Sequence, residues 1–336
     1  MKYKSVTAIQ RGGPQVLQIV ENELREPSAG EARIRVLATG VGRTDINYRF
    51  GYSPFSPKVP FVPGYEIMGL VDAIGTGVTG VSVGERVAAL TGHGGYSEMI
   101  YLGQEHLVSV PPSLAPADVV TLVLNYTSAY QMLQRVAKVK AGDKVLLIGA
   151  SGGVGTAILQ LGKLAGLQMY GTASASKFDV LKDLGAVPID YRSQDFVEEI
   201  RRMEPGGLDF VFDGVGGKEG ERGLAVLRRA GKLIAYATPL GTGSMLQGAL
   251  KMAFTNLLPN GKKAEFYGIS ALYARDKKPF MQDLPLLFNL LAEGKIKPLI
   301  TAQLPLLEAR RANELLESGQ MTGNIVLLAP ELLEVK

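Results

Sequence analysis

The pattern of hydrophobic and polar positions changes once along the chain. Up to about residue 112, short apolar runs are separated by Gly and Pro, and they lie at 32–41, 69–75, 85–90 and 96–102. Short strand-like runs with turn residues at close spacing are typical of all-β barrels. We therefore expect the first part of the chain to form a barrel-like β domain.

From about residue 119 the pattern becomes an alternation of strands and helices. Strand-like runs lie at 144–149, 168–174, 208–216 and 231–238, and the first three are each followed by a helical segment. This alternation predicts a doubly wound parallel sheet with an α/β architecture.

The C-terminal third mixes both kinds of element. We expect a strand in EFYGISAL (265–272), a helix over 281–293 and a strand over 324–330. Because the β-rich first part cannot easily close by itself, the C-terminal residues are expected to return to it. The apolar segment 243–258 fits two interpretations: an ordinary amphipathic helix, or a wall or lid of an apolar substrate pocket.

The stretch KVLLIGASGGVG (144–155) carries the clearest chemical signal. An apolar strand, Val145–Ile148, runs through a glycine turn into a helical segment, which is the context of a dinucleotide-binding loop. Gly152 lets the backbone approach a pyrophosphate, and Gly155 lets the helix pack closely on the strand. Ala150 stands where the usual fingerprint has its first glycine.

Composition mainly excludes certain kinds of site and partner. The 336 residues carry a net charge of +4 and contain no cysteine, which excludes disulfides, thiol nucleophiles and thiolate metal sites. Neither a signal peptide nor an uninterrupted apolar run of membrane-spanning length is apparent, so we expect a cytoplasmic protein without a membrane span. No cluster of basic and aromatic residues indicates nucleic-acid binding.

The second strand of the nucleotide-binding unit indicates which dinucleotide is bound. NAD-type sites place a carboxylate at its end, whereas Ser174, Ser176 and Lys177 stand there. Hydroxyls and an ammonium favour a 2′-phosphate, and Tyr191 after the next strand can add a phenol. We therefore expect NADPH as the cofactor.

These segments resemble the medium-chain dehydrogenase/reductase superfamily, most closely its zinc-independent quinone oxidoreductase branch. The resemblance covers essentially the whole chain. Besides the glycine loop, it rests on GVGRTDINYRFGY (40–52), FVPGYEIMGLVDAIG (61–75), VSVGERV (81–87), GGYSEMIYL (94–102) and DLGAVPIDYR (183–192). It implies a GroES-like β-rich substrate domain at 1–122 and 266–336 and a Rossmann NADPH-binding domain at 123–265.

The resemblance also indicates that a catalytic metal site is missing. Zinc enzymes of the superfamily carry a Cys and a His ligand at places that hold Gly42 and Tyr65 here, while Asp45 and Glu66 remain. Glycine and tyrosine do not replace a thiolate and an imidazole. The two histidines, His93 and His106, are expected to be surface or hydrogen-bonding residues, and we expect no metal.

By the same resemblance, the candidate site residues fall into two groups. Tyr52 is the expected proton donor, with Tyr65 lining the same pocket; a packing role for Tyr52, with solvent supplying the proton, stays open. The residues implied for the cofactor include Ser174, Lys177 and Tyr191 together with Gly42, Thr127, Tyr130, Gly152, Gly153, Val154, Ala237, Thr238, Ile269, Ser270 and Asn324.

The predicted function is hydride transfer from NADPH to a quinone or an α,β-unsaturated carbonyl, because such acceptors need no Lewis acid. An enoyl-thioester reductase is a close alternative. A non-catalytic nucleotide-binding protein, crystallin-like or associated with RNA or membranes, is an alternative of another class. The resemblance further implies a homodimer, in which the edge strand at 265–272 pairs across a two-fold axis.

Overall fold

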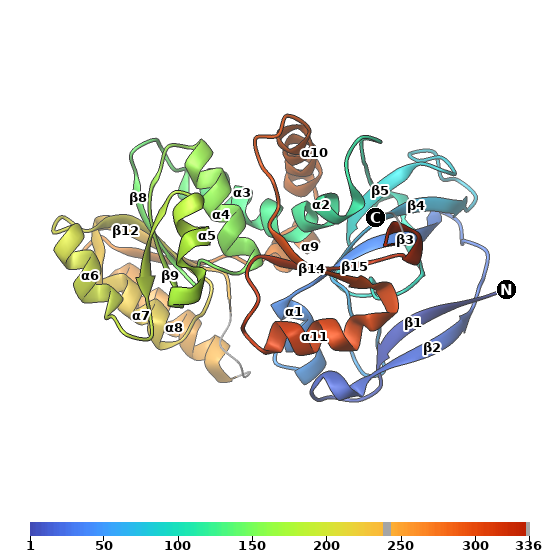
Figure 1. Cartoon of the computed structure of the whole chain (residues 1–336), viewed down its shortest axis with the longest axis horizontal. Helices are drawn as coiled ribbons and strands as arrows, with labels where there is room; N and C mark the ends of the chain where they lie inside the picture. The colour runs from blue at the N-terminus through green and yellow to red at the C-terminus, as the bar shows by residue number, and fades with distance from the viewer. Residues whose placement is uncertain (238–242, 334–336) are drawn as a thin grey trace. The chain divides into compact units, whose positions relative to one another are not determined.

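The computed structural model describes residues 1–237 and 243–333, with side chains described in the second range from 248 onward. Two compact units divide the chain (Figure 1). One comprises Met1–Thr127 and Asp276–Lys336, and the other comprises Ser128–Arg275. The boundaries thus follow Thr127 and Arg275, where the sequence had suggested residues 122 and 265.

The first unit is built on a sheet whose strands come from both ends of the chain. Its order is β14 (Ile300–Pro305), β15 (Asn324–Leu328), β3 (Glu31–Val41), β4 (Glu66–Ile74), β5 (Arg86–Leu90) and β7 (Val108–Ser109), and β6 (Met99–Gly103) also pairs with β3. β15 runs antiparallel to β3, with Val326 opposite Gly40. The C-terminal segment therefore completes the sheet that the N-terminal part begins.

Few helices accompany this sheet. The hairpin β1 (Lys2–Ala8) and β2 (Leu17–Glu23) lies beside it, and the helices are α1 (Arg43–Phe50), α2 (Pro116–Thr121), α10 (Lys278–Ala292) and α11 (Ala309–Glu317). A π-helical turn at Leu122–Tyr126 follows α2. The predicted helix over 281–293 thus begins earlier, at Lys278, and tolerates Pro285 inside it.

The second unit is a six-stranded parallel sheet. Its order is β10 (Ala186–Asp190), β9 (Gln168–Ala173), β8 (Lys144–Ile148), β11 (Leu208–Asp213), β12 (Leu227–Ala235) and β13 (Lys263–Phe266). The chain order reverses between β8 and β11, and such a switch point is where ligands bind in doubly wound sheets. This architecture confirms the predicted fold class.

Helices cover both faces of this parallel sheet. They are α3 (Thr127–Tyr130), α4 (Gly153–Leu164), α5 (Phe178–Asp183), α6 (Phe196–Met203), α7 (Lys218–Ala225), α8 (Gly243–Leu257) and α9 (Ile269–Arg275). Right-handed crossovers place α4 and α5 on one face and α6, α7 and α8 on the other, because the strand order grows in opposite directions. Leu146, Phe196 and Val211 belong to the buried apolar cluster of this unit.

One predicted element is wrong in part. The run 265–272 is not a continuous strand, because β13 ends at Phe266 and helix α9 begins at Ile269. Within the described ranges, no helix combines the length and apolar character needed to cross a bilayer.

Candidate functional site

The glycine loop joins the end of β8 to the start of α4. Gly149 has a left-handed φ of 81°, and Gly152 caps the helix from an extended conformation. A Cβ added at Gly155 would lie 2.5 Å from the carbonyl oxygen of Ala150, so only glycine allows the helix to approach the loop this closely. The first turn of α4 therefore presents its backbone N–H groups at the carboxyl end of the sheet, where a pyrophosphate fits.

Hydrogen bonds to β9 hold the glycine loop in place, and the space beside Gly152 is free for a ligand. Gly149 donates its N–H to Thr172 Oγ1 at 3.0 Å, and Ala150 donates to the Thr172 carbonyl at 3.1 Å. Ala150 is fully buried opposite Gly171, which explains how alanine is accommodated in place of the usual glycine. Nothing lies nearer than 3.9 Å to a Cβ built at Gly152, so a ligand can approach this backbone.

Three predicted cofactor residues meet at the carboxyl ends of β9 and β10. The N–H of Lys177 donates to the Ser174 carbonyl at 2.9 Å, and Tyr191 donates to the Ala173 carbonyl at 3.4 Å. Burial, opposed by Tyr191 and aided by the charge of Arg192, lowers the pKa of Lys177. Because the strands are parallel, this group lies at the same edge as the glycine loop.

Arg192 is a residue of this edge that the sequence analysis missed. Its guanidinium carbon lies 5.7 Å from the centre of the Tyr191 ring, so a second cation stands beside Lys177. The residue pair Tyr191-Arg192 at the end of a predicted strand was the available signal.

In the first unit, Asp45 joins the two places at which zinc enzymes carry their metal ligands. Its carboxylate accepts a hydrogen bond from Gly42 N and another from Gly64 N, both at 2.9 Å. Tyr96 hydrogen-bonds to the same carboxylate, and Asp45 is 3% exposed. Asp45 thus ties together the two segments of this loop frame, which carry Gly42 and Tyr65 at the ligand positions.

Tyr65 is buried in this frame beside Tyr48 and Glu66. The Tyr48 and Tyr65 rings lie 5.9 Å apart at 53°, and their hydroxyl groups are hydrogen-bonded. Burial, reinforced by these neighbours, raises the pKa of Tyr65, so its hydroxyl keeps its proton. Burial and then the charge of Asp45 raise the pKa of Glu66. Its carboxyl lies over Gly40, where a Cβ would be 1.9 Å from Oε1.

Tyr52 follows the end of α1 directly. The helix ends at Gly51 with a left-handed φ of 75°, and Tyr52 N donates to the Asn47 carbonyl at 2.9 Å. Its ring stacks on Phe50 at 5.2 Å and 5°, and the side chain is partly exposed. The stacking fixes the ring, and the hydroxyl is the only group that a change to phenylalanine would remove.

Two predicted cofactor residues already use their polar groups inside the first unit. Thr127 is fully buried and donates its hydroxyl to the Leu122 carbonyl at 2.9 Å. The Asn324 amide accepts from Asn125 at 2.6 Å and donates to the Leu299 carbonyl at 2.9 Å. Both residues are therefore anchored by neighbours of their own unit.

The other predicted cofactor residues lie in the second unit. Tyr130 ends α3, and Ile269 and Ser270 begin α9, where Ile269 is buried. Ala237 follows β12 and lines a cavity beside the helices α7 and α8. Thr238 lies outside the described residues.

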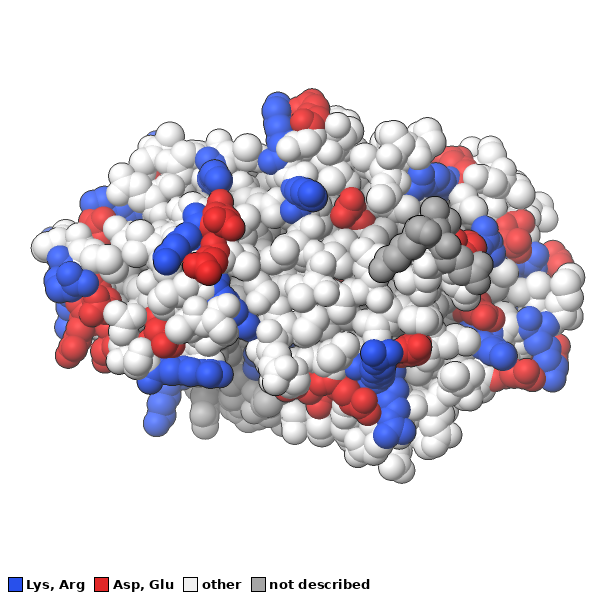
Figure 2. Space-filling view, in the orientation of Figure 1, with Lys and Arg blue, Asp and Glu red and all other residues white. Residues whose placement is uncertain are grey.

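The histidines and the acidic residues form no metal centre in the described ranges, where no group of three or more His, Cys, Asp or Glu side chains could hold an ion. His93 contacts the Phe61 ring edge-on at 6.5 Å, and His106 Nε2 lies 3.1 Å from Lys277 Nζ. On the face in Figure 2, positive and negative side chains are interspersed rather than gathered in one basic strip.

Comparison with known proteins gives two matching families and many relatives. The alcohol dehydrogenase GroES-like domain matches residues 28–112, and the zinc-binding dehydrogenase family matches residues 184–327. The synaptic vesicle membrane protein VAT-1 homolog of Danio rerio is 32% identical over 322 residues, covering 91% of this chain and 66% of that protein. The chain thus spans slightly less than two thirds of this relative.

Solved structures match over nearly the full length. Escherichia coli quinone oxidoreductase complexed with NADPH superposes with a TM-score of 0.87 at 27% identity, over 97% of this chain and 99% of that chain. The CurK enoyl reductase gives a TM-score of 0.85 at 26% identity, over 98% and 99%.

Proposed function

Because the chain belongs to the medium-chain dehydrogenase/reductase superfamily, in its zinc-independent quinone oxidoreductase-like branch, we propose that it is an NADPH-dependent reductase of quinones or α,β-unsaturated carbonyls. One observation carries the proposal: Asp45 holds the loop frame of a metal site whose ligand positions are Gly42 and Tyr65. Glycine has no side-chain ligand and tyrosine does not replace an imidazole, so these two positions do not supply the ligands with which zinc enzymes of the superfamily hold their Lewis acid. Reduction of an electron-poor acceptor has no such need.

The cofactor is assigned to the carboxyl edge of the parallel sheet. Gly152, Gly153 and Val154 would hold the pyrophosphate through backbone N–H groups, and NADPH would supply the hydride. Lys177 and Arg192 favour a 2′-phosphate, because no carboxylate follows β9 directly and these two cations lie near its end. Ser174 and Tyr191 would add hydroxyl groups to the same phosphate.

The nicotinamide half of the site is assigned by family resemblance. Gly42, Thr127, Tyr130, Ala237, Thr238, Ile269, Ser270 and Asn324 occupy the corresponding positions in this sequence. Thr127 and Asn324 already have hydrogen-bond partners in their own unit, so contact with the cofactor would add to these bonds.

Tyr52 is assigned the role of proton donor. When hydride adds to the β-carbon of an enone, the C=C electron pair moves toward the carbonyl oxygen, which becomes negative. The Tyr52 hydroxyl donates a hydrogen bond or its proton to the product, and solvent restores the phenol. Tyr65 is assigned to the pocket wall, where its retained proton makes it a neutral donor.

An enoyl-thioester reductase is the second candidate, and the likeness to the CurK enoyl reductase favours it. The electron flow is the same, because a thioester also conjugates a C=C bond with a carbonyl group. The two candidates differ in substrate rather than in the residues assigned here.

A substrate panel tests the proposal. Purified protein treated with a strong chelator is mixed with NADPH and with quinones, enones, alkenals or enoyl thioesters, and loss of the nicotinamide absorbance is followed. We expect turnover of quinones or enones that the chelator does not reduce. Turnover of enoyl thioesters alone would favour the second candidate, and activity restored only by zinc would refute the metal-free mechanism.

We further propose that the protein is a cytoplasmic homodimer. The family resemblance and the edge position of β13 in the parallel sheet support this assembly.

A further inference from the structure

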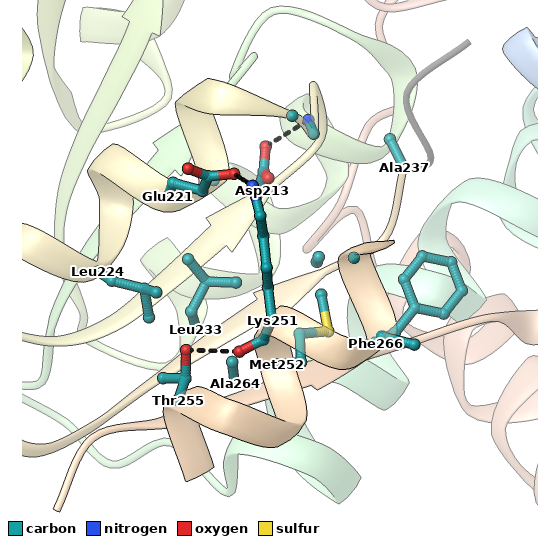
Figure 3. A pocket seen from close by; sticks show the side chains of 16 residues that line it. Asp213, Glu221, Leu224, Leu233, Ala237, Lys251, Met252, Thr255, Ala264 and Phe266 are labelled. Carbon is teal, nitrogen blue, oxygen red and sulfur yellow. Dashed lines mark hydrogen bonds and ion pairs between the residues drawn. The ribbon is translucent and has the colours of Figure 1, made fainter. Parts of the chain in front are cut away.

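The second unit contains a cavity that, among the described residues assigned to the cofactor, includes only Ala237 in its lining. It has a volume of about 340 Å³ and lies between helices α7 and α8 and the strands β12 and β13 (Figure 3). Leu233, Ala235 and Ala264 form its floor on the sheet, and Leu224 and Met252 form walls from the two helices.

The cavity is separate from the assigned cofactor positions at the glycine loop. Its described lining comes from residues 213–266, with no contribution from the loop 149–155 or from Ser174, Lys177 and Tyr191. Helix α4, whose first turn receives the pyrophosphate, lies on the opposite face of the sheet by the handedness of the crossovers.

Each polar side chain that lines the cavity already has a partner. The Asp213 carboxylate accepts from Val215 N and Gly216 N, both at 2.9 Å, and is 1% exposed. Lys251 of α8 forms an ion pair with Glu221 of α7, which spans the space between the helices in Figure 3. The Thr255 hydroxyl donates to the Lys251 carbonyl at 2.9 Å.

We propose that this cavity binds an uncharged, apolar small molecule. A charged ligand would have to break the Lys251–Glu221 pair or compete with the backbone amides that hold Asp213, whereas an apolar one leaves all these contacts intact. A cavity of about 150 Å³ suffices for benzene, so this one has room for a two-ring aromatic molecule or a comparable hydrocarbon.

The same geometry connects the cavity to the glycine loop. Asp213 and Gly216 line the cavity, and Asp213 fixes the amide of Val215. Val215 lies over Gly149, where an added Cβ would be 3.1 Å from Val215 Cγ2, and Gly214 N donates to the Ile148 carbonyl at 3.0 Å. A ligand that packs against Asp213 leaves these hydrogen bonds in place but restrains the turn that supports the glycine loop, so the cavity acts as an effector site for dinucleotide binding.

The test uses the full chain and the neutral fluorescent probe N-phenyl-1-naphthylamine. Two matched variants on α8 separate the cavity from the outer surface. Ala249→Trp fills the cavity from a lining position, whereas Leu250→Ala reduces the apolar surface at a neighbouring position that does not line it and is 63% exposed. Circular dichroism and thermal unfolding confirm that both variants are folded.

We expect saturable binding of one probe per chain, at least tenfold weaker in Ala249→Trp and unchanged in Leu250→Ala. Saturating NADPH should leave the probe bound while changing its affinity several-fold, and the probe should change NADPH affinity by the same factor. Loss of binding in Leu250→Ala but not in Ala249→Trp would overturn the site, as would stoichiometric displacement by NADPH. Equal affinities with and without NADPH would overturn its role as an effector site. None of these outcomes depends on which acceptor the enzyme reduces.

Discussion

The hydroxyl of Tyr52 offers the most direct test of the chemistry. Tyr52→Phe keeps the ring that stacks on Phe50 and removes only the proposed proton donor. We expect kcat on an enone to fall by about 10²–10⁴-fold while NADPH affinity is unchanged, as is typical for loss of a general acid. Quinone reduction should fall less, because a hydroquinone anion is a more stable product. Enone turnover equal to that of the parent would assign Tyr52 to packing alone.

The cations beside the predicted 2′-phosphate position give a second test. Lys177→Ala should weaken NADPH binding by about 1–3 kcal/mol, and Arg192→Ala should weaken it as well. Both variants should leave NADH binding nearly unchanged, because only NADPH carries the phosphate. Lys182→Ala is the matched control, since this lysine of α5 is largely exposed and pairs with Asp179. Titration calorimetry with both cofactors measures the difference. Equal weakening of NADH would show that neither cation contacts the phosphate.

Glu66 provides a prediction about stability and pH. Because burial raises its pKa in the folded state, the folded protein holds this proton more tightly than the unfolded chain does. The contribution of Glu66 to the free energy of unfolding must then fall as the pH rises above about 4.5, the ordinary pKa of the group. Glu66→Gln removes this penalty, so its melting temperature should exceed that of the parent by an amount that grows toward pH of about 8. A constant difference across this range would contradict the raised pKa.

Motifs allowed some of these residues to be predicted, and tertiary contacts decide the others. Gly42, Tyr65 and Lys177 were identifiable because each stands in a recognisable segment. Arg192 acquires its place only when β10 pairs with β9, and its position directly after Tyr191 was the one local signal for it. The alanine at position 150 departs from the fingerprint, yet Gly171 on the neighbouring strand supplies the missing space.

Two glycines near the turn between β8 and α4 have different predicted roles. Gly155 is expected to affect stability, and Gly152 is expected to affect cofactor binding. In Gly155→Ala the new methyl would lie 2.5 Å from a backbone oxygen, so we expect a loss of about 1–3 kcal/mol in unfolding free energy. Gly152→Ala meets nothing nearer than 3.9 Å, so stability should be unchanged while the methyl obstructs the pyrophosphate. Thermal unfolding and NADPH titration of both variants check this. Normal NADPH affinity in Gly152→Ala would place the pyrophosphate elsewhere.

Helices and strands were predictable where the apolar period is long and bounded by turn residues. Strand β8 and helix α4 are such cases, and both follow the predicted pattern. The run 265–272 misled the prediction, because its apolar residues continue across Gly268 while the chain turns from strand to helix. Short apolar runs do not by themselves distinguish these two states.

Long-range pairing lay beyond the sequence patterns. The alternation of strands and helices predicted a parallel sheet, and the incomplete β-rich part predicted that the C-terminus returns to it. The register that places Val326 opposite Gly40 depends on residues almost the whole chain apart, and so does the order of the strands. These features arise from packing between segments, which a periodic pattern in one segment does not encode.

We predict that two chains form a homodimer, and the structure changes which groups are expected to make its interface. The edge strand β13 is partly closed, because the Asn256 side chain accepts from Ala264 N at 2.8 Å and donates to the Ala264 carbonyl at 2.9 Å. The backbone groups of Ala264 are therefore already hydrogen-bonded and are not available to pair with a strand of a second chain. A dimer at this edge must use side chains as well, and α8 offers Phe254 and Leu257 at helical spacing, exposed by 64% and 83%.

We expect light scattering to give the mass of two chains at micromolar concentration, and Phe254→Lys to give the mass of one, because a buried unpaired charge is costly. Leu286→Lys is the matched control: this residue of α10 is 46% exposed and belongs to the other unit, so its dimer should persist. Asn256→Ala should not weaken the dimer, since it only frees the backbone groups of Ala264. A parent protein with the mass of a single chain would refute the dimer, and an unaffected Phe254→Lys variant would place its interface away from α8.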